Sequence, residues 1–444
     1  MKNGLLKSNT LVLLLILLAE SLASQTLPRR VFLGIRMEPL TEDAKSIMGI
    51  NEVAGVLVNE VFAQSTASNA GWQRGDVMIK LQDKPVSSTA EVFAVLSGQK
   101  SGSKFSFELI RDKKVIKGNA VFSSFPEETY SDISMEYTSS TTTVGPQRIV
   151  LSKRVNSEGK LPLIVFIGGI GCYSLDTPFD TSRSEIQLLN QLSRSGFICA
   201  RLEKPGMGDN AGLSTPCEAL SFMEESNSYV ASIRALKNRA DVDSNAVFII
   251  GHSMGGVFAP LVSQQTKVKG IIAYGTIGSN FIEYLAKTRR TISEALDMNP
   301  VETDDFIKEF CACSAYYFVD KLTTEQAALK NPVCRNYLSA FDLRSRAYND
   351  ELYAFNYPGL WSTFNGKALL LWGENDYIAS KEDHEILKQT MDYYKKGSTD
   401  FIIVPQADHG MHITSGFQDA HNNPGPYQTG VSEIVLNWLK KAQS

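Results

Sequence analysis

The stretch that decides the fold is Ala246-Val-Phe-Ile-Ile-Gly251-His252-Ser253-Met254-Gly255-Gly256, which places Gly-x-Ser-x-Gly between an apolar run and a helical stretch at 257–265. A strand-to-helix turn of this kind is so tight that the positions two before and two after the serine hold no bulky side chain. The serine hydroxyl then projects over the helix N-terminus, where free N–H groups favour negative charge. The stretch therefore predicts a nucleophile at Ser253.

Apolar runs without polar alternation lie on both sides of this stretch. Such runs are typical of strands buried on both faces of a sheet, and helical stretches separate them. The alternation predicts an α/β fold, a mostly parallel sheet with helices on both faces. The predicted strands are 161–167, 197–202, 246–250, 270–274, 368–372 and 401–404, and the predicted helices include 218–237, 381–396 and 431–441. The interval 277–366 interrupts this pattern and is interpreted as a helical lid insertion.

Candidate partners of Ser253 follow two later strands. A serine hydroxyl needs a base, and the base needs an orienting acid. Asp376 lies just past the strand 368–372, and His409 lies just past the strand 401–404. Because parallel strands end at one sheet edge, the three side chains are predicted to meet there.

The other acidic and imidazole groups near these strands are weighed by their distance from a strand end and by their local structure. The alternatives left open are Glu374 for the acid, and His412 and His421 for the base. The groups not favoured for these roles are His252 in the serine turn, His384 in a predicted helix, and Asp408, which is interpreted as structural or solvated.

An oxyanion intermediate needs preorganised N–H donors. Met254, which follows the nucleophile, is one predicted donor. The loop Gly168-Gly169-Ile170-Gly171 after the first buried strand supplies the other. Ile170 is the preferred residue and Gly169 the alternative, while a simple tight turn is the other interpretation of this loop.

Residues from about 130 to 441 resemble an α/β-hydrolase, because GGIG, GHSMGG, GENDYI and ADHG occur in the order and at the spacing of that family. The resemblance implies a hydrolase domain over 148–444 that uses a Ser-His-Asp triad and an acyl-enzyme. Two departures are visible: Gly168 stands where many members have His, and the turn 203–209 lacks the family's Ser. Cys172 and Cys217 resemble a paired arrangement of exported members, which implies a disulfide between them.

Residues 30–122 resemble a PDZ domain of bacterial envelope serine proteases. The matching pieces include Phe32-Leu33-Gly34-Ile35 and the turn Ala-Gly-Trp-Gln-Arg-Gly-Asp at 70–76. The resemblance implies a small, mainly-β domain that binds an extended peptide, with backbone N–H groups of Phe32, Leu33, Gly34 and Ile35 holding its terminal carboxylate. An intramolecular regulatory or packing module with an empty groove is the alternative. Residues 123–147, rich in Ser and Thr, are interpreted as a linker and a first, exposed strand.

Residues 1–23 have the pattern of a cleaved secretory signal. Lys2 and Lys7 precede the apolar run 11–19, and small residues follow at Ser21 and Ala23. The run is too short to span a bilayer, and an uncleaved anchor is the alternative. The sequence therefore predicts export to the periplasm or the extracellular space, with a bacterial envelope favoured.

The six cysteines are interpreted in that compartment, where disulfides form. The spacing contains no Cys-x-x-Cys pair, so neither a structural metal nor any other cofactor is predicted. Cys199 lies in an apolar run and is interpreted as a buried free thiol. The other five cysteines remain candidates for bridges, with the connectivity open.

Composition excludes several classes of protein. The chain has 444 residues, 43% apolar and 21% charged, with a net charge of −4. These values exclude a disordered chain and give no general attraction to nucleic acid, and no apolar run is long enough for a transmembrane helix. The expected function is an exported serine hydrolase acting on a small acyl substrate or a peptide, with a carboxylic ester favoured. The alternatives are a serine peptidase or aminopeptidase of the same fold and a non-catalytic PDZ-hydrolase scaffold.

Overall fold

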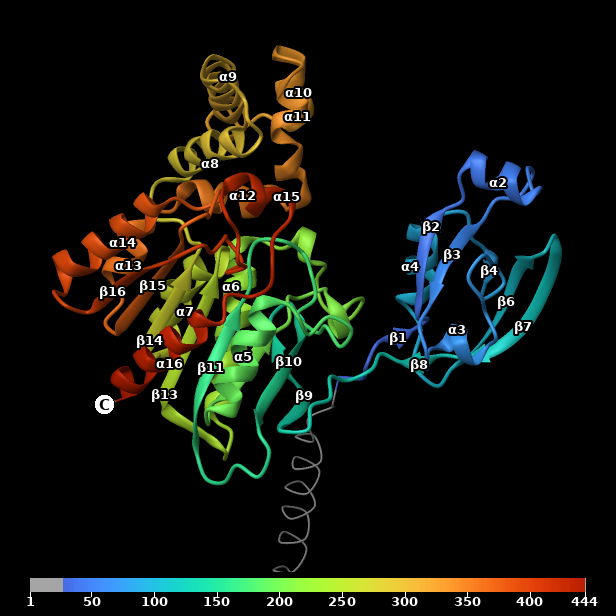
Figure 1. Cartoon of the computed structure of the whole chain (residues 1–444), viewed down its shortest axis with the longest axis horizontal. Helices are drawn as coiled ribbons and strands as arrows, with labels where there is room; N and C mark the ends of the chain where they lie inside the picture. Colours follow the sequence, from blue (N-terminus) through green and yellow to red (C-terminus); the bar gives the residue numbers. More distant parts are fainter. Residues whose placement is uncertain (1–26, 444) are drawn as a thin grey trace, which may run out of the picture.

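The computed structural model of the chain describes residues 27–443, so the predicted signal segment 1–23 lies outside the described residues. A large α/β part carries an insertion of helices at one end, and a smaller, mainly-β part lies beside it (Figure 1). Among residues 27–443, no helix has the length and apolar character needed to cross a membrane.

An eight-stranded sheet forms the centre of the large part, in the order β16-β15-β14-β13-β11-β12-β10-β9. The six strands from β16 to β12 run parallel, whereas β9 and β10 form an antiparallel hairpin at one edge. The strands are β9 (Ile133–Thr142), β10 (Gly145–Arg154), β11 (Leu161–Ile167), β12 (Ile198–Leu202), β13 (Val242–His252), β14 (Gly270–Tyr274), β15 (Lys367–Gly373) and β16 (Thr399–Val404).

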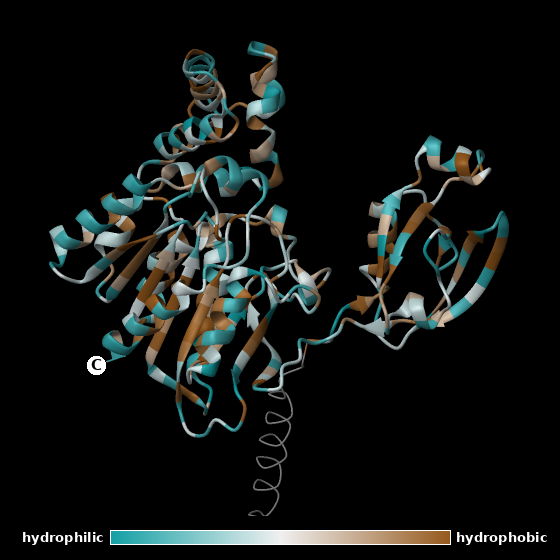
Figure 2. Cartoon of the chain, viewed as in Figure 1, coloured by the Kyte–Doolittle hydropathy of each residue, from teal (hydrophilic) through white to brown (hydrophobic). Residues whose placement is uncertain are grey.

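Helices cover both faces of this sheet, as the buried apolar strands require (Figure 2). One face packs against α5 (Ser184–Arg194) and α16 (Gly430–Gln443). The other face packs against α6 (Phe222–Lys237), α7 (Met254–Thr266), α13 (Tyr357–Ser362) and α14 (Lys381–Tyr394). Neighbouring residues of β13 show the alternation, since Ile249 belongs to one core and Ile250 to the other.

The insertion between β14 and β15 is helical. It comprises α8 (Phe281–Ala295), α9 (Pro300–Phe318), α10 (Thr324–Lys330), α11 (Cys334–Leu338), η3 (Ser339–Leu343), α12 (Arg346–Ala354) and α13. A disulfide between Cys313 and Cys334 joins α9 to α11. The insertion follows the C-terminal end of β14, and Figure 1 shows its helices beyond the C-terminal ends of the parallel strands. A short helix, α15 (Phe417–Asn422), and the turns η1 (Gly208–Asn210) and η2 (Cys217–Ala219) complete this part.

The start of the sheet differs from the sequence-based expectation. The structure uses both β9 and β10 as sheet strands, so the sheet begins at Ile133 and β10 crosses the expected boundary at 147/148. The Ser- and Thr-rich composition hides this hairpin, in which one hydroxyl is buried against a helix. Ser140 lies 2.6 Å from Ser232 of α6, hydroxyl to hydroxyl, and both are buried.

The smaller part is built on an antiparallel sheet in the order β2-β3-β4-β6-β7, with β5 paired to β4 and a separate pair of β1 and β8. Its strands are β1 (Val31–Phe32), β2 (Ile35–Pro39), β3 (Val56–Val61), β4 (Val77–Leu81), β5 (Lys84–Pro85), β6 (Lys104–Arg111), β7 (Lys114–Val121) and β8 (Ser123–Ser124). Its helices are α2 (Glu42–Met48), α3 (Thr66–Asn69) and α4 (Thr89–Leu96). The edge strand β2 has α4 packed against it.

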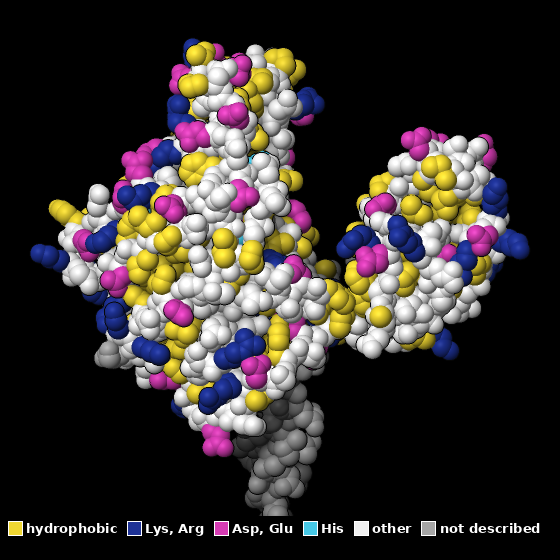
Figure 3. Space-filling view, viewed as in Figure 1, with side chains coloured by type: hydrophobic (Ala, Val, Ile, Leu, Met, Phe, Trp, Pro, Cys, Tyr) yellow, Lys and Arg dark blue, Asp and Glu magenta, His cyan; other side chains and the backbone are white. Residues whose placement is uncertain are grey.

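Two sets of contacts join the parts. The Arg29 guanidinium lies 2.7 Å from the Asp176 carboxylate and 2.6 Å from the Asp209 carboxylate, and both acids are buried. Phe179 of the α/β part lies against Phe32 and Phe62, with ring centroids 5.2 and 5.3 Å apart. Figure 3 shows hydrophobic side chains gathered at this junction, with charges of both signs scattered over the rest of the visible face.

Candidate active site

Ser253 lies in a sharp turn between β13 and α7. Its backbone has φ 54° and ψ −118°, a conformation that residues other than glycine rarely adopt. A Cβ on Gly255 would lie 2.0 Å from the Ile167 carbonyl oxygen, and a Cβ on Gly251 would lie 2.3 Å from the Gly255 carbonyl oxygen. The glycines of the motif are therefore needed because backbone segments approach one another there.

His409 and Asp376 meet at the same edge of the sheet. Asp376 follows β15 and His409 follows β16, and the imidazole Nδ1 lies 3.0 Å from each carboxylate oxygen of Asp376. The backbone N–H groups of Ile378 and Ala379 also donate to Asp376 Oδ1, at 2.9 and 2.8 Å. This carboxylate is fully buried, and the His409 side chain is 12% exposed.

The surroundings of His409 act on its basicity in opposite directions. Burial lowers the pKa of the imidazole, because the charged form loses solvation. The attraction of the Asp376 carboxylate and its hydrogen bond outweigh burial, so the pKa of His409 lies above its ordinary value.

Ser253 and His409 lie on either side of the end of β14. The Ser253 N–H donates to the Tyr274 carbonyl at 2.9 Å, and the next residue, Gly275, faces the His409 ring, which a Cβ there would approach to 2.8 Å. In residues 27–443, the Ser253 hydroxyl makes no hydrogen bond to the His409 imidazole. Such bonds are often long before substrate binds.

His252 has a role that the sequence analysis missed. Its Nε2 lies 3.2 Å from the His409 carbonyl oxygen, and its ring stacks on Tyr274. Burial and the nearby His409 lower the pKa of His252 to about 3, so this ring stays neutral and holds the backbone of the neighbouring histidine. Adjacency to Ser253 was its only signal in the sequence.

The other candidates have partners elsewhere. Glu374 accepts the Gln406 N–H at 3.0 Å and so braces the next loop. His384 is buried, with Nδ1 2.9 Å from the Ser380 carbonyl, and burial lowers its pKa. His412 lies 3.2 Å from Asp408, and His421 lies 3.1 Å from Asn422.

The expected oxyanion loop lies against Ser253. A Cβ on Gly169 would lie 3.4 Å from Ser253 Cβ and 3.8 Å from its hydroxyl oxygen. The N–H of Gly169 donates to the Tyr173 hydroxyl at 2.8 Å, so this alternative donor is already used. Ile170 is exposed, and Met254 begins α7, where N–H groups have no acceptor within the helix.

A buried charge cluster supports the loop from the insertion side. Arg344, which follows η3, donates from Nη1 to the Ile170 carbonyl at 2.8 Å and from Nη2 to the Glu225 carboxylate. Lys204 pairs with the same carboxylate at 2.6 Å. Burial lowers the pKa of Lys204, whereas the two cations outweigh burial and hold the pKa of Glu225 below its ordinary value. No local sequence pattern indicates that these distant residues converge.

The structure contains the expected Cys172–Cys217 disulfide, which ties the segment after the oxyanion loop to η2. Cys199 is a buried free thiol, and Cys311 is also free. Burial raises the pKa of Cys199 to about 12, so this thiol is unreactive at neutral pH. Within residues 27–443, no cluster of three or more His, Cys, Asp or Glu side chains is arranged to hold a metal ion.

The Phe32–Ile35 segment forms a loop that leads into the edge strand β2. Gly34 has φ 72°, and a Cβ on it would lie 2.0 Å from Ser65 Cβ, so only glycine fits. The carbonyl groups of Leu33 and Gly34 accept from the N–H groups of Ala67 and Phe62. The N–H groups of Leu33 and Gly34 have no acceptor in the described part of the chain, as expected of a loop that binds a carboxylate.

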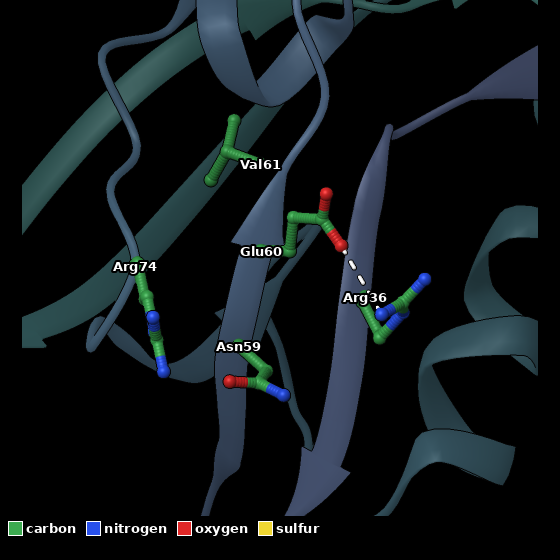
Figure 4. Close-up of a pocket in the computed structure, with 5 residues that line it drawn as sticks. All are labelled: Arg36, Asn59, Glu60, Val61 and Arg74. Carbon is green, nitrogen blue, oxygen red and sulfur yellow. Dashed lines mark ion pairs between the residues drawn. The ribbon is translucent and has the colours of Figure 1, made fainter.

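A separate hollow of about 540 Å³ lies over β2 and β3 of the small part. Figure 4 shows Arg36 and Glu60 pointing toward one another, joined by an ion pair of 3.3 Å, with Arg74 opposite. Arg36 and Glu60 are largely exposed, so this hollow is a surface feature of the small part and contains none of the residues predicted for the Ser253 site.

Comparison with known proteins places this geometry in a family. A model described as the alpha/beta hydrolase family matches residues 164–419, which is more than half of the chain. The chain belongs to the alpha/beta hydrolase family. A PDZ domain model matches residues 31–120, so this hydrolase carries an N-terminal PDZ domain. Both matches confirm the resemblances seen in the sequence.

Curated relatives of this hydrolase match its PDZ part. The periplasmic serine endoprotease DegP of Salmonella typhimurium is 35% identical over 91 residues, which are 20% of this chain and 19% of that protein. A DegP-like periplasmic serine endoprotease of Ectopseudomonas mendocina is 29% identical over 110 residues, 25% of this chain and 23% of that protein. The hydrolase thus spans about a fifth of the length of the curated relatives it matches.

Solved structures similar to this hydrolase include esterases. Est1E from Butyrivibrio proteoclasticus is 12% identical, with a TM-score of 0.43, and the match covers 69% of this chain and 98% of that one. A thermophilic esterase from Thermogutta terrifontis is 16% identical, with a TM-score of 0.41 and coverage of 70% and 100%.

Proposed function

We propose that this alpha/beta hydrolase is an exported serine hydrolase that cleaves an acyl bond, with a carboxylic ester as the favoured substrate. The hydrogen bond between Asp376 and His409 supports this proposal most, because it lies at the strand ends where the Ser253 turn also lies. A buried carboxylate that fixes an imidazole beside a strained serine is the arrangement that makes a hydroxyl nucleophilic.

In the proposed mechanism, the Ser253 hydroxyl oxygen attacks the acyl carbonyl carbon while His409 Nε2 takes its proton. Asp376 accepts the Nδ1–H and stabilises the imidazolium. The N–H groups of Met254 and Ile170 bind the oxyanion of the tetrahedral intermediate. His409 then gives the proton to the leaving group, and water hydrolyses the acyl-enzyme by the same steps.

A fluorophosphonate probe tests this proposal, since it phosphonylates only an activated serine. We expect the mature protein to be labelled and the Ser253→Ala variant to stay unlabelled. Labelling that is absent from both proteins, or equal in both, would exclude the proposed nucleophile. Labelling absent from both proteins leaves the non-catalytic scaffold, whereas equal labelling would assign the activated serine to another position.

A panel of substrates distinguishes an esterase from a peptidase. The PDZ domain favours a peptidase, because a groove for peptides beside a hydrolase suits a peptide substrate. We expect short acyl p-nitrophenyl esters to be hydrolysed with a higher kcat/KM than aminoacyl p-nitroanilides. The opposite ranking would assign the site to a serine peptidase or aminopeptidase.

The PDZ domain is proposed to bind a peptide C-terminus at residues 32–35. The two N–H groups without acceptors and the edge position of β2 support this role. Peptides with a free carboxylate should bind in fluorescence polarisation, and the same peptides with a C-terminal amide should not. Equal binding of both forms would reject carboxylate recognition.

Export is proposed for the same chain. The signal-like segment 1–23 and the two disulfides support it. N-terminal sequencing of the protein from a periplasmic fraction should begin near Ser24. Recovery only from the cytosol with residues 1–23 retained would contradict this proposal.

A further inference from the structure

Tyr173 stands out because its side chain folds back over the glycine loop that precedes it. A Cβ on Gly168 would lie 2.7 Å from the Tyr173 hydroxyl oxygen, and a Cβ on Gly171 would lie 3.0 Å from its ring. The tyrosine therefore occupies the space that side chains at these two positions would need. The loop is glycine-rich, and glycine has little conformational preference of its own, so its shape depends on such outside contacts.

Two hydrogen bonds fix this loop from opposite sides. The Gly169 N–H, which is buried, donates to the Tyr173 hydroxyl at 2.8 Å, and the Ile170 carbonyl accepts from Arg344 at 2.8 Å. The peptide group between residues 169 and 170 lies between these two fixed points. Its N–H is the proposed oxyanion donor, so the direction of that N–H depends on both hydrogen bonds.

The tyrosine is itself firmly held. Its neighbour Cys172 is bonded to Cys217, and the Arg183 guanidinium lies over its ring, 5.5 Å from the centroid. Burial raises the pKa of Tyr173, which keeps its hydroxyl protonated at neutral pH. A Cβ on Gly169 would be 3.6 Å from the Tyr173 hydroxyl and 3.8 Å from the Ser253 hydroxyl. The hydrogen bond between Gly169 and Tyr173 therefore lies close to Ser253.

We propose that Tyr173 is a positioning residue for acyl transfer: its hydroxyl orients the Gly169 amide, so that the Ile170 N–H faces the developing oxyanion. This inference rests on the proposed function, because it assigns a role within the Ser253 reaction. A misdirected donor weakens binding of the transition state more than binding of the substrate.

The first test replaces only the hydroxyl. In Tyr173→Phe, we expect kcat for p-nitrophenyl acetate to fall about 10- to 100-fold, less than the loss of a whole oxyanion donor, while KM changes less than about twofold. The matched control is Tyr357→Phe, which removes another buried hydroxyl, bonded to the Leu352 carbonyl at 2.8 Å, in the insertion. The control should keep the wild-type kcat. A wild-type kcat in Tyr173→Phe would overturn the inference.

A double-mutant cycle tests the contact itself. Gly168→Ala in the wild type forces its Cβ against the Tyr173 hydroxyl, so kcat should fall at least as far as in Tyr173→Phe. In the Tyr173→Phe background the nearest ring atom is 3.4 Å away, which is an ordinary contact. Adding Gly168→Ala there should then lower kcat less than about twofold. Effects that multiply independently would contradict a shared mechanism.

A readout without catalysis keeps the two proposals apart. In Ser253→Ala, the Gly169 amide should exchange with deuterium at least tenfold faster once Tyr173→Phe is added, and an unchanged rate would show that the Tyr173 hydroxyl does not hold this amide. If wild-type protein shows no Ser253-dependent labelling, the proposed function fails and this role fails with it. If labelling is present and Tyr173→Phe has normal kinetics, only the inference about Tyr173 fails.

Discussion

At the scale of single residues, the site contains groups in energetically unfavourable states: a strained backbone and a buried charge. Ser253 has a backbone conformation that is rare for a residue with a side chain, and Asp376 is a fully buried carboxylate. Each state is maintained by neighbours: glycines leave room for the turn, and two backbone N–H groups and an imidazole bond the carboxylate. The proposed chemistry therefore depends on residues outside the proposed triad.

The proposed role of His409 as the base sets the pH dependence expected for hydrolysis. The base must be neutral, and its pKa is raised, so activity should fall on acidification with a midpoint above the ~6.5 of an ordinary imidazole. In Asp376→Asn, burial remains but the attraction is lost, so the midpoint should move to lower pH and the maximal rate should drop about 10²- to 10⁴-fold. Profiles of kcat/KM measure both effects. Glu374→Gln is the control, and a profile shifted by it rather than by Asp376→Asn would reverse the assignment of the acid.

The glycine after the nucleophile offers a stability test. Gly255→Ala places a Cβ against the backbone of β11, so it should lower the free energy of unfolding by about 3 kcal/mol and abolish fluorophosphonate labelling. Gly416→Ala, where a Cβ has open space, should change stability by less than about 1 kcal/mol. Urea unfolding compares the two. Similar losses in both variants would show that steric contact at the turn is not the cause.

At the scale of elements, the hydrophobic pattern of the sequence predicts the buried strands of the sheet. The strands β11 and β14 have the predicted bounds, because both are short apolar runs buried on both faces. Because parallel strands end together, the order of the strands predicts that Asp376 and His409 approach one another, and the structure has them hydrogen-bonded. The Ser- and Thr-rich sequence predicts a linker for part of the β9–β10 hairpin, because an edge strand with a buried hydroxyl contact lacks an apolar pattern. The Arg344–Glu225–Lys204 cluster depends on how the insertion packs, which no local pattern reports.

The two disulfides should affect different elements. Cys172–Cys217 closes a loop of 45 residues beside the oxyanion loop, and Cys313–Cys334 closes one of 21 residues within the insertion. Chain entropy gives about 4 and about 3 kcal/mol for loops of these lengths. We expect Cys172→Ser/Cys217→Ser to lower both stability and kcat, and Cys313→Ser/Cys334→Ser to lower mainly stability. Urea unfolding and ester hydrolysis measure this, and equal losses of kcat would contradict the assignment.

At the scale of the whole molecule, the PDZ domain and the hydrolase part meet at loops that also border the site. Phe179, which contacts the PDZ residues Phe32 and Phe62, lies on the segment between Cys172 and α5, and that segment begins at the oxyanion loop. Asp176, on the same segment, pairs with Arg29, which immediately precedes the PDZ domain. The junction is thus continuous with the loop that carries the proposed oxyanion donor.

The ion pairs of Arg29 with Asp176 and Asp209 should contribute to the stability of the hydrolase part. Arg29→Met removes one cation from the buried Asp176 and Asp209, although Asp209 keeps Arg148 and Asp176 keeps Arg30. The lost charged hydrogen bonds should lower the stability of the hydrolase part by about 2 kcal/mol. Arg36→Met removes an exposed pair with Glu60 and should cost less than about 1 kcal/mol. Because the parts need not unfold together, the urea midpoint of ester hydrolysis is the suitable measurement. A midpoint that moves equally in both variants would show that these ion pairs contribute nothing beyond surface charge, whereas a shift confined to Arg29→Met ties the stability of the hydrolase part to the segment that leads into the PDZ domain.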